Sequence, residues 1–242
     1  MKLTEAQIEP GLRLFAVGDI HGCADQLHKM LLLIKQDVSD RPTQRVKIVF
    51  LGDYIDRGPE NRRVIETLMS LETGGLDCVF LLGNHDERMI KFIEDPELVW
   101  DAMMRWGGVQ TLASYGIVAE PGEGEKSISD RLKTQVPAEH LQFLKSLKCF
   151  HVQDDFYFCH AGVRPGISLA DQSEHDLIWI RDDFRSHKEP FEKVIVHGHT
   201  PQGEPEVEAN RINVDTKCYE TGVLTALVLE GNSHRFLQAG AD

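Results

Sequence analysis

The sequence predicts an α/β fold, and three observations lead to this prediction. Short apolar runs rich in Val, Ile, Leu and Phe recur along the chain, and helical patterns separate the first three of them. The chain has 242 residues, of which 41% are hydrophobic, which is enough for one large core. No shift in composition marks a second core, so we expect one domain over residues 1–242.

The first three strands are expected at residues 12–17, 47–52 and 78–83, where apolar runs are short enough for buried strands. Between them, residues 24–36 and 61–72 carry apolar residues at spacings of three and four, the period of a helix. A strand, a helix and a strand in succession favour parallel pairing, with the helices covering the sheet.

A helical insert is predicted over about residues 87–148. Residues 87–115 have a helical pattern, 120–127 are expected to form an exposed loop, and 137–148 form a helix that begins at its proline. Within the insert, residues 89–106 place Met and Trp at helical spacing. This pattern is typical of a core, and the alternative is that these side chains form a roof over a substrate pocket.

Four further apolar runs follow the insert with little helix between them. They lie at residues 156–162, 194–199, 212–216 and 224–231. We therefore expect the second half of the chain to be more antiparallel than the first.

Charge and cysteine content restrict the class of protein. The chain carries 26 basic and 39 acidic residues, and its formal charge of −13 opposes binding to nucleic acid or to anionic membranes. Five cysteines without a C-x-x-C pair indicate a reducing compartment. The N-terminus lacks the apolar core of a signal peptide, and no run approaches 18 apolar residues. We expect a cytoplasmic protein without nucleic-acid or membrane partners, and the sequence indicates no particular oligomeric state.

Three of the early strands end in the same way, with a glycine followed directly by a residue that can bind a metal. The motifs are GDIHG at 18–22, GDYIDRG at 52–58 and GNHDE at 83–87. In open α/β sheets, ligands bind beyond the carboxyl ends of the strands. These three strand ends are therefore expected to face one pocket.

Two later apolar runs end in a histidine, which completes a candidate set of metal ligands. The set is Asp19, His21, Asp53, Asn84, His160 and His199. Carboxylate, amide and imidazole ligands together suit Mn, Fe or Zn. Six ligands are too many for one tetrahedral ion, and they suit two ions that share a carboxylate.

The order GDxHG, GDxxDRG, GNHD, a single His and GHT resembles the metallophosphoesterase superfamily over roughly residues 12 to 230. Within it, the chain is most similar to bacterial-type phosphoprotein (serine/threonine) phosphatases. Leu82 before GNHD and the HAGV that begins at His160 depart from the eukaryotic enzymes of that group. The resemblance implies a calcineurin-like fold, in which two mixed β-sheets pack as a sandwich flanked by helices.

The resemblance also implies how two divalent ions are bound. Asp19, His21 and Asp53 would hold the first ion, and Asp53, Asn84, His160 and His199 would hold the second. Mn²⁺ is the expected ion, with Fe or Zn as alternatives. Pro201 stands where the broader superfamily has the second histidine of GHxH, so water is expected at that position.

The implied mechanism is direct attack on phosphorus by a hydroxide that bridges the two ions, without a phosphoenzyme. His85 would be the general acid for the departing alkoxide, and Asp56 would orient it. Arg57 and Arg181 would bind the substrate phosphate. For Arg181, salt bridges to the two aspartates that follow it are the alternative.

These residues lead us to expect a metal-dependent serine/threonine protein phosphatase. Its substrates would be phosphoserine and phosphothreonine in proteins, with phosphotyrosine and small aryl phosphates as further substrates. The alternative is a dinucleoside polyphosphate hydrolase. A related bacterial branch with that activity shares GDIHGC and a helical insert after GNH, but it commonly departs from the DRG triplet present here. An alternative of another class is a non-catalytic metal-binding scaffold, although no ligand or acid is missing.

Overall fold

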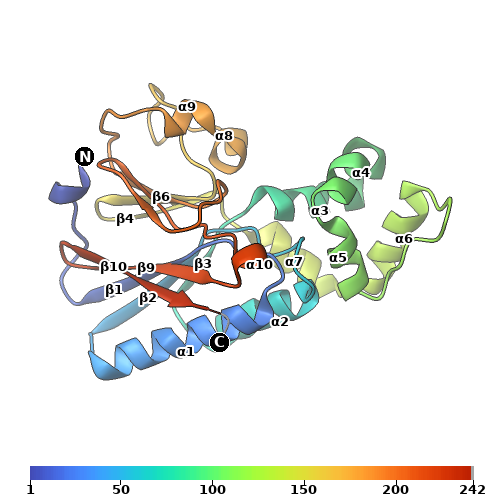
Figure 1. The fold of residues 1–242 in the computed structure, drawn as a ribbon, viewed down its shortest axis with the longest axis horizontal. Helices are drawn as coiled ribbons and strands as arrows, with labels where there is room; N and C mark the ends of the chain where they lie inside the picture. The colour runs from blue at the N-terminus through green and yellow to red at the C-terminus, as the bar shows by residue number, and fades with distance from the viewer. Residues whose placement is uncertain (241–242) are drawn as a thin grey trace.

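Two five-stranded β-sheets pack face to face in the computed structural model, which describes residues 1–240 (Figure 1). In spatial order, the first sheet contains β10 (Ser233–Ala239), β9 (Leu224–Glu230), β1 (Leu12–Val17), β2 (Arg45–Phe50) and β3 (Cys78–Phe80). The second contains β4 (Phe150–Gln153), β5 (Phe156–Cys159), β6 (Val194–His197), β8 (Arg211–Asn213) and β7 (Glu206–Val207). This architecture confirms the expected sandwich of two mixed sheets.

Ten α-helices flank the sheets in the described part of the chain. They are α1 (Ala24–Asp40), α2 (Asn61–Thr73), α3 (Asn84–Glu94), α4 (Pro96–Arg105), α5 (Gly108–Ser114), α6 (Glu125–Gln135), α7 (Ala138–Ser146), α8 (Glu174–Trp179), α9 (Asp182–Arg185) and α10 (Cys218–Thr221). Helices α1 and α2 cover the first sheet, α8 and α9 cover the second, and α3 to α6 extend to one side (Figure 1). None of the helices within residues 1–240 combines the length and apolarity needed to cross a bilayer.

The first sheet has the parallel centre that the sequence predicts. Strand β1 pairs in parallel with β2, and β2 with β3. Along β1, Leu14 and Ala16 pack in the core between the two sheets, whereas Phe15 and Val17 pack in the core beneath α1 and α2. All six residues of β1 are buried because both of its faces are covered. This double burial explains why the strand is a continuous apolar run.

The second half of the chain is more antiparallel than the first, as expected, and β9 pairs antiparallel with both β1 and β10. The central strands of the second sheet are the exception. Strand β6 pairs in parallel with both β5 and β8, and only the edge strands β4 and β7 pair antiparallel. The connection from β5 to β6 runs through α8 and α9, which have six and four residues and are too short for a recognisable helical period. As a result, β5 and β6 end at the same edge of the sheet.

The insert differs from the sequence-based expectation at one loop. Residues 84–146 contain the five helices α3 to α7, and α6 begins at Glu125, inside the stretch expected to be a loop. Ile128 and Leu132 of α6 are fully buried in the same apolar cluster as Met103 of α4. These two side chains are enough to fix the helix against the rest of the insert.

One buried charge ties the first sheet to α1. Arg13 on β1 is 2% exposed, and its guanidinium donates to both carboxylate oxygens of Glu230 at 3.0 and 2.9 Å. It also donates to Asp37 of α1 at 3.0 Å. The hydrogen bonds from Arg13 lower the pKa of Glu230. The buried guanidinium is thus paired on both sides, as buried charges require.

Candidate functional site

The structure brings all six predicted ligand residues together where the parallel strands of both sheets end. Asp19 and His21 follow β1, Asp53 follows β2, and Asn84 is the first residue of α3. His160 follows β5 and His199 follows β6. Each of the six is at most 4% exposed. Parallel pairing in both sheets, including the part that the sequence did not predict, is what directs these ends to one place.

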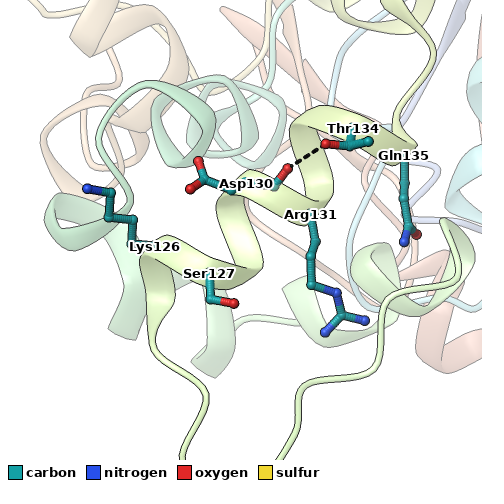
Figure 2. A pocket seen from close by; sticks show the side chains of 6 residues that line it. All are labelled: Lys126, Ser127, Asp130, Arg131, Thr134 and Gln135. Carbon is teal, nitrogen blue, oxygen red and sulfur yellow. Dashed lines mark hydrogen bonds between the residues drawn. The ribbon is translucent and has the colours of Figure 1, made fainter.

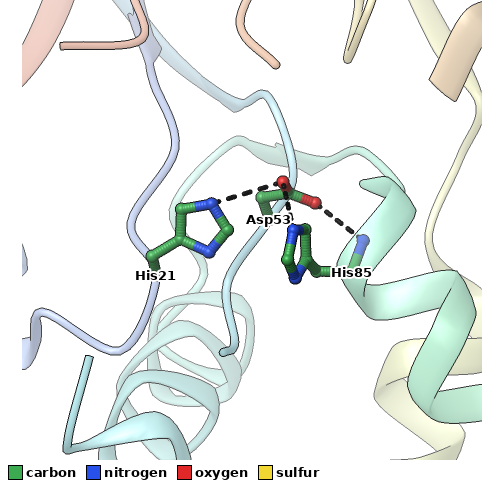
Figure 3. Close-up of side chains that lie close together, drawn as sticks. All are labelled: His21, Asp53 and His85. Carbon is green, nitrogen blue, oxygen red and sulfur yellow. Dashed lines mark hydrogen bonds and ion pairs between the residues drawn. The ribbon is translucent and has the colours of Figure 1, made fainter. Parts of the chain in front are cut away.

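Two buried triads of potential metal ligands share Asp53. One is His21, Asp53 and His85, and the other is Asp53, His160 and His199, with the ligand atoms of each within 4.8 Å of one another. Oδ2 of Asp53 lies 3.4 Å from Nε2 of His21 and 3.4 Å from Nε2 of His160. Figure 3 shows the first triad, in which both imidazoles lie against the Asp53 carboxylate. A shared carboxylate between two triads is consistent with a dinuclear metal site.

The histidine rings are oriented as metal-ligating imidazoles usually are. Nδ1 of His21 lies 2.7 Å from the carbonyl oxygen of Ile55, and Nδ1 of His160 lies 3.0 Å from that of Leu51. Each contact allows Nδ1 to carry a ring proton and directs Nε2 at the cluster, where it would bind a cation. Nε2 of His199 is buried and has no hydrogen-bond partner in residues 1–240. These imidazole nitrogens fit the binding of a pair of divalent cations.

Asn84 and Asp19 contact the second triad. Oδ1 of Asn84 lies 3.0 Å from Nε2 of His160 and 2.8 Å from Nδ1 of His199. The backbone N–H of His199 donates to Oδ2 of Asp19 at 3.1 Å. Asp19 belongs to neither triad, but this hydrogen bond places its carboxylate beside His199 of the second triad.

Burial and mutual charge set the protonation of the cluster. Burial lowers the pKa of His21 to about 3 and that of His199 to about 2, so both rings are neutral. Burial would raise the pKa of Asp53, but His160 and other histidines outweigh it and hold this pKa well below its usual range. Burial acts to lower the pKa of His160, whereas Asp53 and Asp19 raise it to about 9. A divalent cation would replace the His160 proton as the balancing charge.

Two of the glycines that precede ligands are required by close approach. A Cβ on Gly83 would lie 2.2 Å from Oδ1 of Asp53, and a Cβ on Gly198 would lie 2.0 Å from Oδ1 of Asp19. Any side chain at either position would displace a carboxylate of the cluster. At these two positions, close approach is the physical reason why a glycine precedes the ligand.

Backbone strain is concentrated in the same place. Positive φ angles occur at His21 (46°), Asp53 (52°), Asp56 (71°), Arg57 (67°) and His199 (62°). Non-glycine residues with such angles cost about 1–3 kcal/mol each and persist where the surrounding structure enforces them. The strained positions are those whose side chains converge on the cluster.

The two residues expected to handle a proton form a hydrogen-bonded pair. Nδ1 of His85 lies 2.6 Å from Oδ2 of Asp56, and both residues are 2% exposed. Thr111 of α5 donates from Oγ1 to Oδ1 of Asp56 at 2.5 Å and accepts the Asp56 backbone N–H at 3.0 Å. Thr111 was not predicted, because nothing in the sequence of the insert indicates which of its residues meets the DRG turn.

Arg57, expected to bind phosphate, lies at the edge of the cluster. Its Nη2 is 3.5 Å from Nε2 of His85, and its Nη1 donates to the hydroxyl of Tyr219 in α10. Its Cζ lies 4.5 Å from the centre of the Tyr219 ring. Its Nε is buried without a partner in the described chain. Tyr219, which the sequence did not identify, therefore holds the guanidinium and leaves a donor unused.

Arg181 is exposed, and its side chain makes no hydrogen bond or ion pair within residues 1–240. The expected alternative, a salt bridge to one of the following aspartates, is not found, because Asp183 pairs with Arg164 at 3.1 Å. The positive charge of Arg181 adds to burial and to His160 in lowering the pKa of His199. Arg181 therefore stands beside the cluster with its guanidinium free.

Two further residues, one within the GNHDE motif and one directly after it, belong to the site and were not predicted. Oδ2 of Asp86 accepts the backbone N–H groups of Asp53 at 2.8 Å and Gly83 at 3.0 Å, and so joins the second and third motifs. Arg88 is 3% exposed, and its Nη1 lies 3.3 Å from Nδ1 of His85. Asp86 lies within the motif, which was the available signal for it, whereas Arg88 follows the motif and had no such signal.

A surface hollow elsewhere does not carry this chemistry. Its lining side chains all come from α6, at the far side of the insert (Figure 2). They are Lys126, Ser127, Asp130, Arg131, Thr134 and Gln135. None of them is a predicted ligand or proton donor, so the strand-end cluster is the candidate site.

Known proteins resemble this chain over almost its whole length. Bis(5'-nucleosyl)-tetraphosphatase PrpE [asymmetrical] of Anoxybacillus flavithermus is 28% identical over 235 residues, which cover 87% of this chain and 88% of that protein. A crystal structure described as a candidate diadenosine tetraphosphatase has a TM-score of 0.62 at 20% identity and covers 97% of both chains. A Saccharomyces cerevisiae protein serine/threonine phosphatase has a TM-score of 0.58 at 14% identity and covers 96% of this chain and 81% of its own.

The similarity to these two solved structures establishes the fold, and the sequence establishes the family. The sequence model for calcineurin-like phosphoesterases matches residues 12–228, which include every residue of both triads. The chain therefore belongs to the calcineurin-like phosphoesterase family and is a metal-dependent phosphoesterase.

Proposed function

We propose that this phosphoesterase hydrolyses dinucleoside polyphosphates. The observation that carries the proposal is a group of arginines with unused donors at the metal cluster of an acidic protein. Nε of Arg57 and Nη2 of Arg88 are buried without partners in the described residues, and the side chain of Arg181 is free. A bridge of several phosphates offers anionic oxygens to the exposed guanidinium of Arg181 and is attracted by the positive charge of the two partly unpaired arginines. Relatives named bis(5'-nucleosyl)-tetraphosphatase support this choice over the protein phosphatase that the motifs alone favoured.

The six residues at the strand ends are proposed as the ligands of two divalent cations. Asp19, His21 and Asp53 hold the first, and Asp53, Asn84, His160 and His199 hold the second. We propose Mn²⁺, with Fe or Zn as alternatives, because the ligands combine carboxylate, amide and imidazole groups. Two such ions polarise phosphoryl oxygens and bring the pKa of water towards neutrality.

The chain's own residues bind the phosphate and move one proton. Arg57 and Arg181 grip phosphoryl oxygens, since a planar guanidinium can donate two parallel hydrogen bonds. His85 donates a proton from Nε2 to the leaving oxygen, while its Nδ1 stays hydrogen-bonded to Asp56. The Asp56 carboxylate fixes the orientation of the ring.

The second candidate function is hydrolysis of phosphoserine and phosphothreonine in proteins. The pairing of Asp56 and His85 at 2.6 Å favours it, because an alkoxide needs a proton donor more than a phosphate leaving group does. Both functions use the same cluster. They differ in the group attached to the phosphate that is attacked, which is a nucleoside polyphosphate in one case and a serine or threonine side chain in the other.

A direct competition separates the candidates. The Mn²⁺-loaded protein is given diadenosine tetraphosphate and a phosphoserine peptide at equal concentration, with Asp53→Asn as the control for contaminating activity. We expect the dinucleotide to be consumed first, giving a mononucleotide and a nucleoside triphosphate. Faster release of phosphate from the peptide would replace the proposal with the second candidate. Failure to cleave either substrate in a fully loaded protein would support the non-catalytic scaffold.

A further inference from the structure

Two tryptophans from distant parts of the chain meet at the rim of the cluster. Trp106 follows α4 and Trp179 ends α8, and their ring centres are 6.2 Å apart at an angle of 46°. The Trp106 ring lies 6.5 Å from the ring of His85, and the Trp179 ring lies 6.4 Å from that of His199. The pair therefore borders the site on the side of the proposed proton donor.

Arg88 holds the two rings in place. Its Cζ lies 4.5 Å from the centre of Trp106 and 5.4 Å from that of Trp179, so the cation faces both rings. Trp179 is fixed further, because its Nε1 donates to Oε2 of Glu87 at 3.1 Å. The rings are thus positioned before any substrate binds, which reduces the entropy cost of stacking against them.

Trp106 keeps an open face. Its side chain is 40% exposed, although it contacts a buried arginine and lies near a buried histidine. The following residue, Gly107, accepts the backbone N–H of Arg57 at 3.2 Å, which anchors Trp106 to the phosphate-binding turn. A large, fixed and exposed aromatic ring beside an anion site is a platform on which a flat ring attached to a phosphate can stack.

We propose that Trp106, with Arg88 and Trp179 beneath and beside it, forms a subsite for the base of a nucleotide whose phosphate lies at the metal cluster. This inference rests on the proposed function and adds to it the group that the site recognises beyond the phosphate. Of the planar groups that could stack here, a nucleobase fits best, because the ribose provides the spacing that carries a base from the cluster to its rim.

The test compares two ligands that share a phosphate and a ribose and differ only in the base. Binding of adenosine 5'-monophosphate and of ribose 5-phosphate to the Mn²⁺-loaded protein is measured by calorimetry. We expect the wild type to bind the nucleotide about tenfold or more tightly, in line with the ~1–3 kcal/mol that stacking contributes per base. Trp106→Ala should bring the ratio of affinities close to one, and Trp106→Phe should retain part of it.

Leu98→Ala is the matched control, because Leu98 lies on α4, the helix that Trp106 follows, and is 70% exposed. This variant should keep the wild-type ratio. Equal affinities in the wild type, an unchanged ratio in Trp106→Ala, or an equal loss of both ligands in that variant would each overturn the subsite. This test measures the binding of a nucleoside monophosphate, so its result does not depend on the hydrolysis measured in the substrate competition. A base preference without dinucleotide hydrolysis would refute the proposed function and not the subsite.

Discussion

Thr111 is hydrogen-bonded to Asp56 at both the side chain and the backbone. Its hydroxyl donates to Oδ1 at 2.5 Å and accepts the N–H at 3.0 Å, so the insert fixes the carboxylate that in turn orients His85. A hydroxyl group can donate one hydrogen bond and accept another at the same time, and that of Thr111 does both.

Replacing this hydroxyl should therefore impair catalysis without removing the metals. Thr111→Val leaves a buried N–H and a buried carboxylate oxygen unpaired, which costs about 1–3 kcal/mol. We expect kcat to fall by about tenfold or more, with two metal ions per chain retained in elemental analysis. Thr111→Ser keeps the hydroxyl and should recover most of the rate. Wild-type kcat in Thr111→Val would show that Asp56 needs no such support.

The proposed proton donor predicts an effect that depends on the leaving group. His85→Asn should slow hydrolysis of a phosphoester with a basic alkoxide leaving group by about 10²–10⁴-fold. The loss should be much smaller for p-nitrophenyl phosphate, whose leaving group needs no proton. Steady-state rates on both substrates, together with metal content, separate this role from ligation. Loss of a metal ion in His85→Asn would instead make His85 a ligand, as its place in the first triad allows.

Arg181 should affect substrate binding and not stability. Because its side chain has no partner within residues 1–240, Arg181→Ala should leave the thermal midpoint unchanged. It should raise KM for the phosphate substrate by about tenfold, since a hydrogen bond to a charged group contributes about 1.5–3 kcal/mol. Arg164→Ala is the control: this exposed arginine pairs with Asp176 and Asp183, so its removal should not change KM. An unchanged KM in Arg181→Ala would refute phosphate binding.

The ion pair between buried Arg13 and half-exposed Glu230 predicts how stability changes with pH. The pKa of Glu230 is below its ordinary value of 4.5 in the folded chain, because Arg13 donates to its carboxylate. The stability that ionised Glu230 contributes is therefore present above its pKa in the unfolded chain. It is lost as the pH falls through its lower pKa in the folded chain. Denaturant unfolding should show Glu230→Gln less stable than wild type at about pH 7, with a smaller difference at about pH 4. A difference that grew towards acid would contradict the assignment.

The strands that the sequence identifies are those covered on both faces. Leu12–Val17 and Leu224–Glu230 are apolar along almost their whole length, because helices or the other sheet cover each face. Strands Phe150–Gln153 and Ser233–Ala239 were missed because they lie at sheet edges and mix exposed with half-buried residues. Their sequences have neither an apolar run nor a clean alternation, so only pairing with a neighbour defines them.

The site divides in a similar way. The ligands were predictable because each follows a strand and most follow a glycine, a local pattern that repeats along the chain. Thr111 and Tyr219 were not, because their contacts depend on how the insert and α10 pack against the DRG turn. Trp106 lies in the stretch 89–106, for which a roof over a pocket was the alternative to a core, but the pattern did not single out this residue. The motifs did not determine the substrate class, since the DRG triplet concerns the phosphate that is attacked and not the group attached to it.

The proposed activity depends on two cations that share Asp53, so the most direct test is the metal content of the purified chain. Elemental analysis of wild type and Asp53→Asn after equilibration with Mn²⁺ and gel filtration should give two ions per chain in the first. It should give one or none in the second, with loss of phosphoesterase activity. Full activity in wild-type protein stripped of metal by a chelator, or two ions retained by Asp53→Asn, would contradict it.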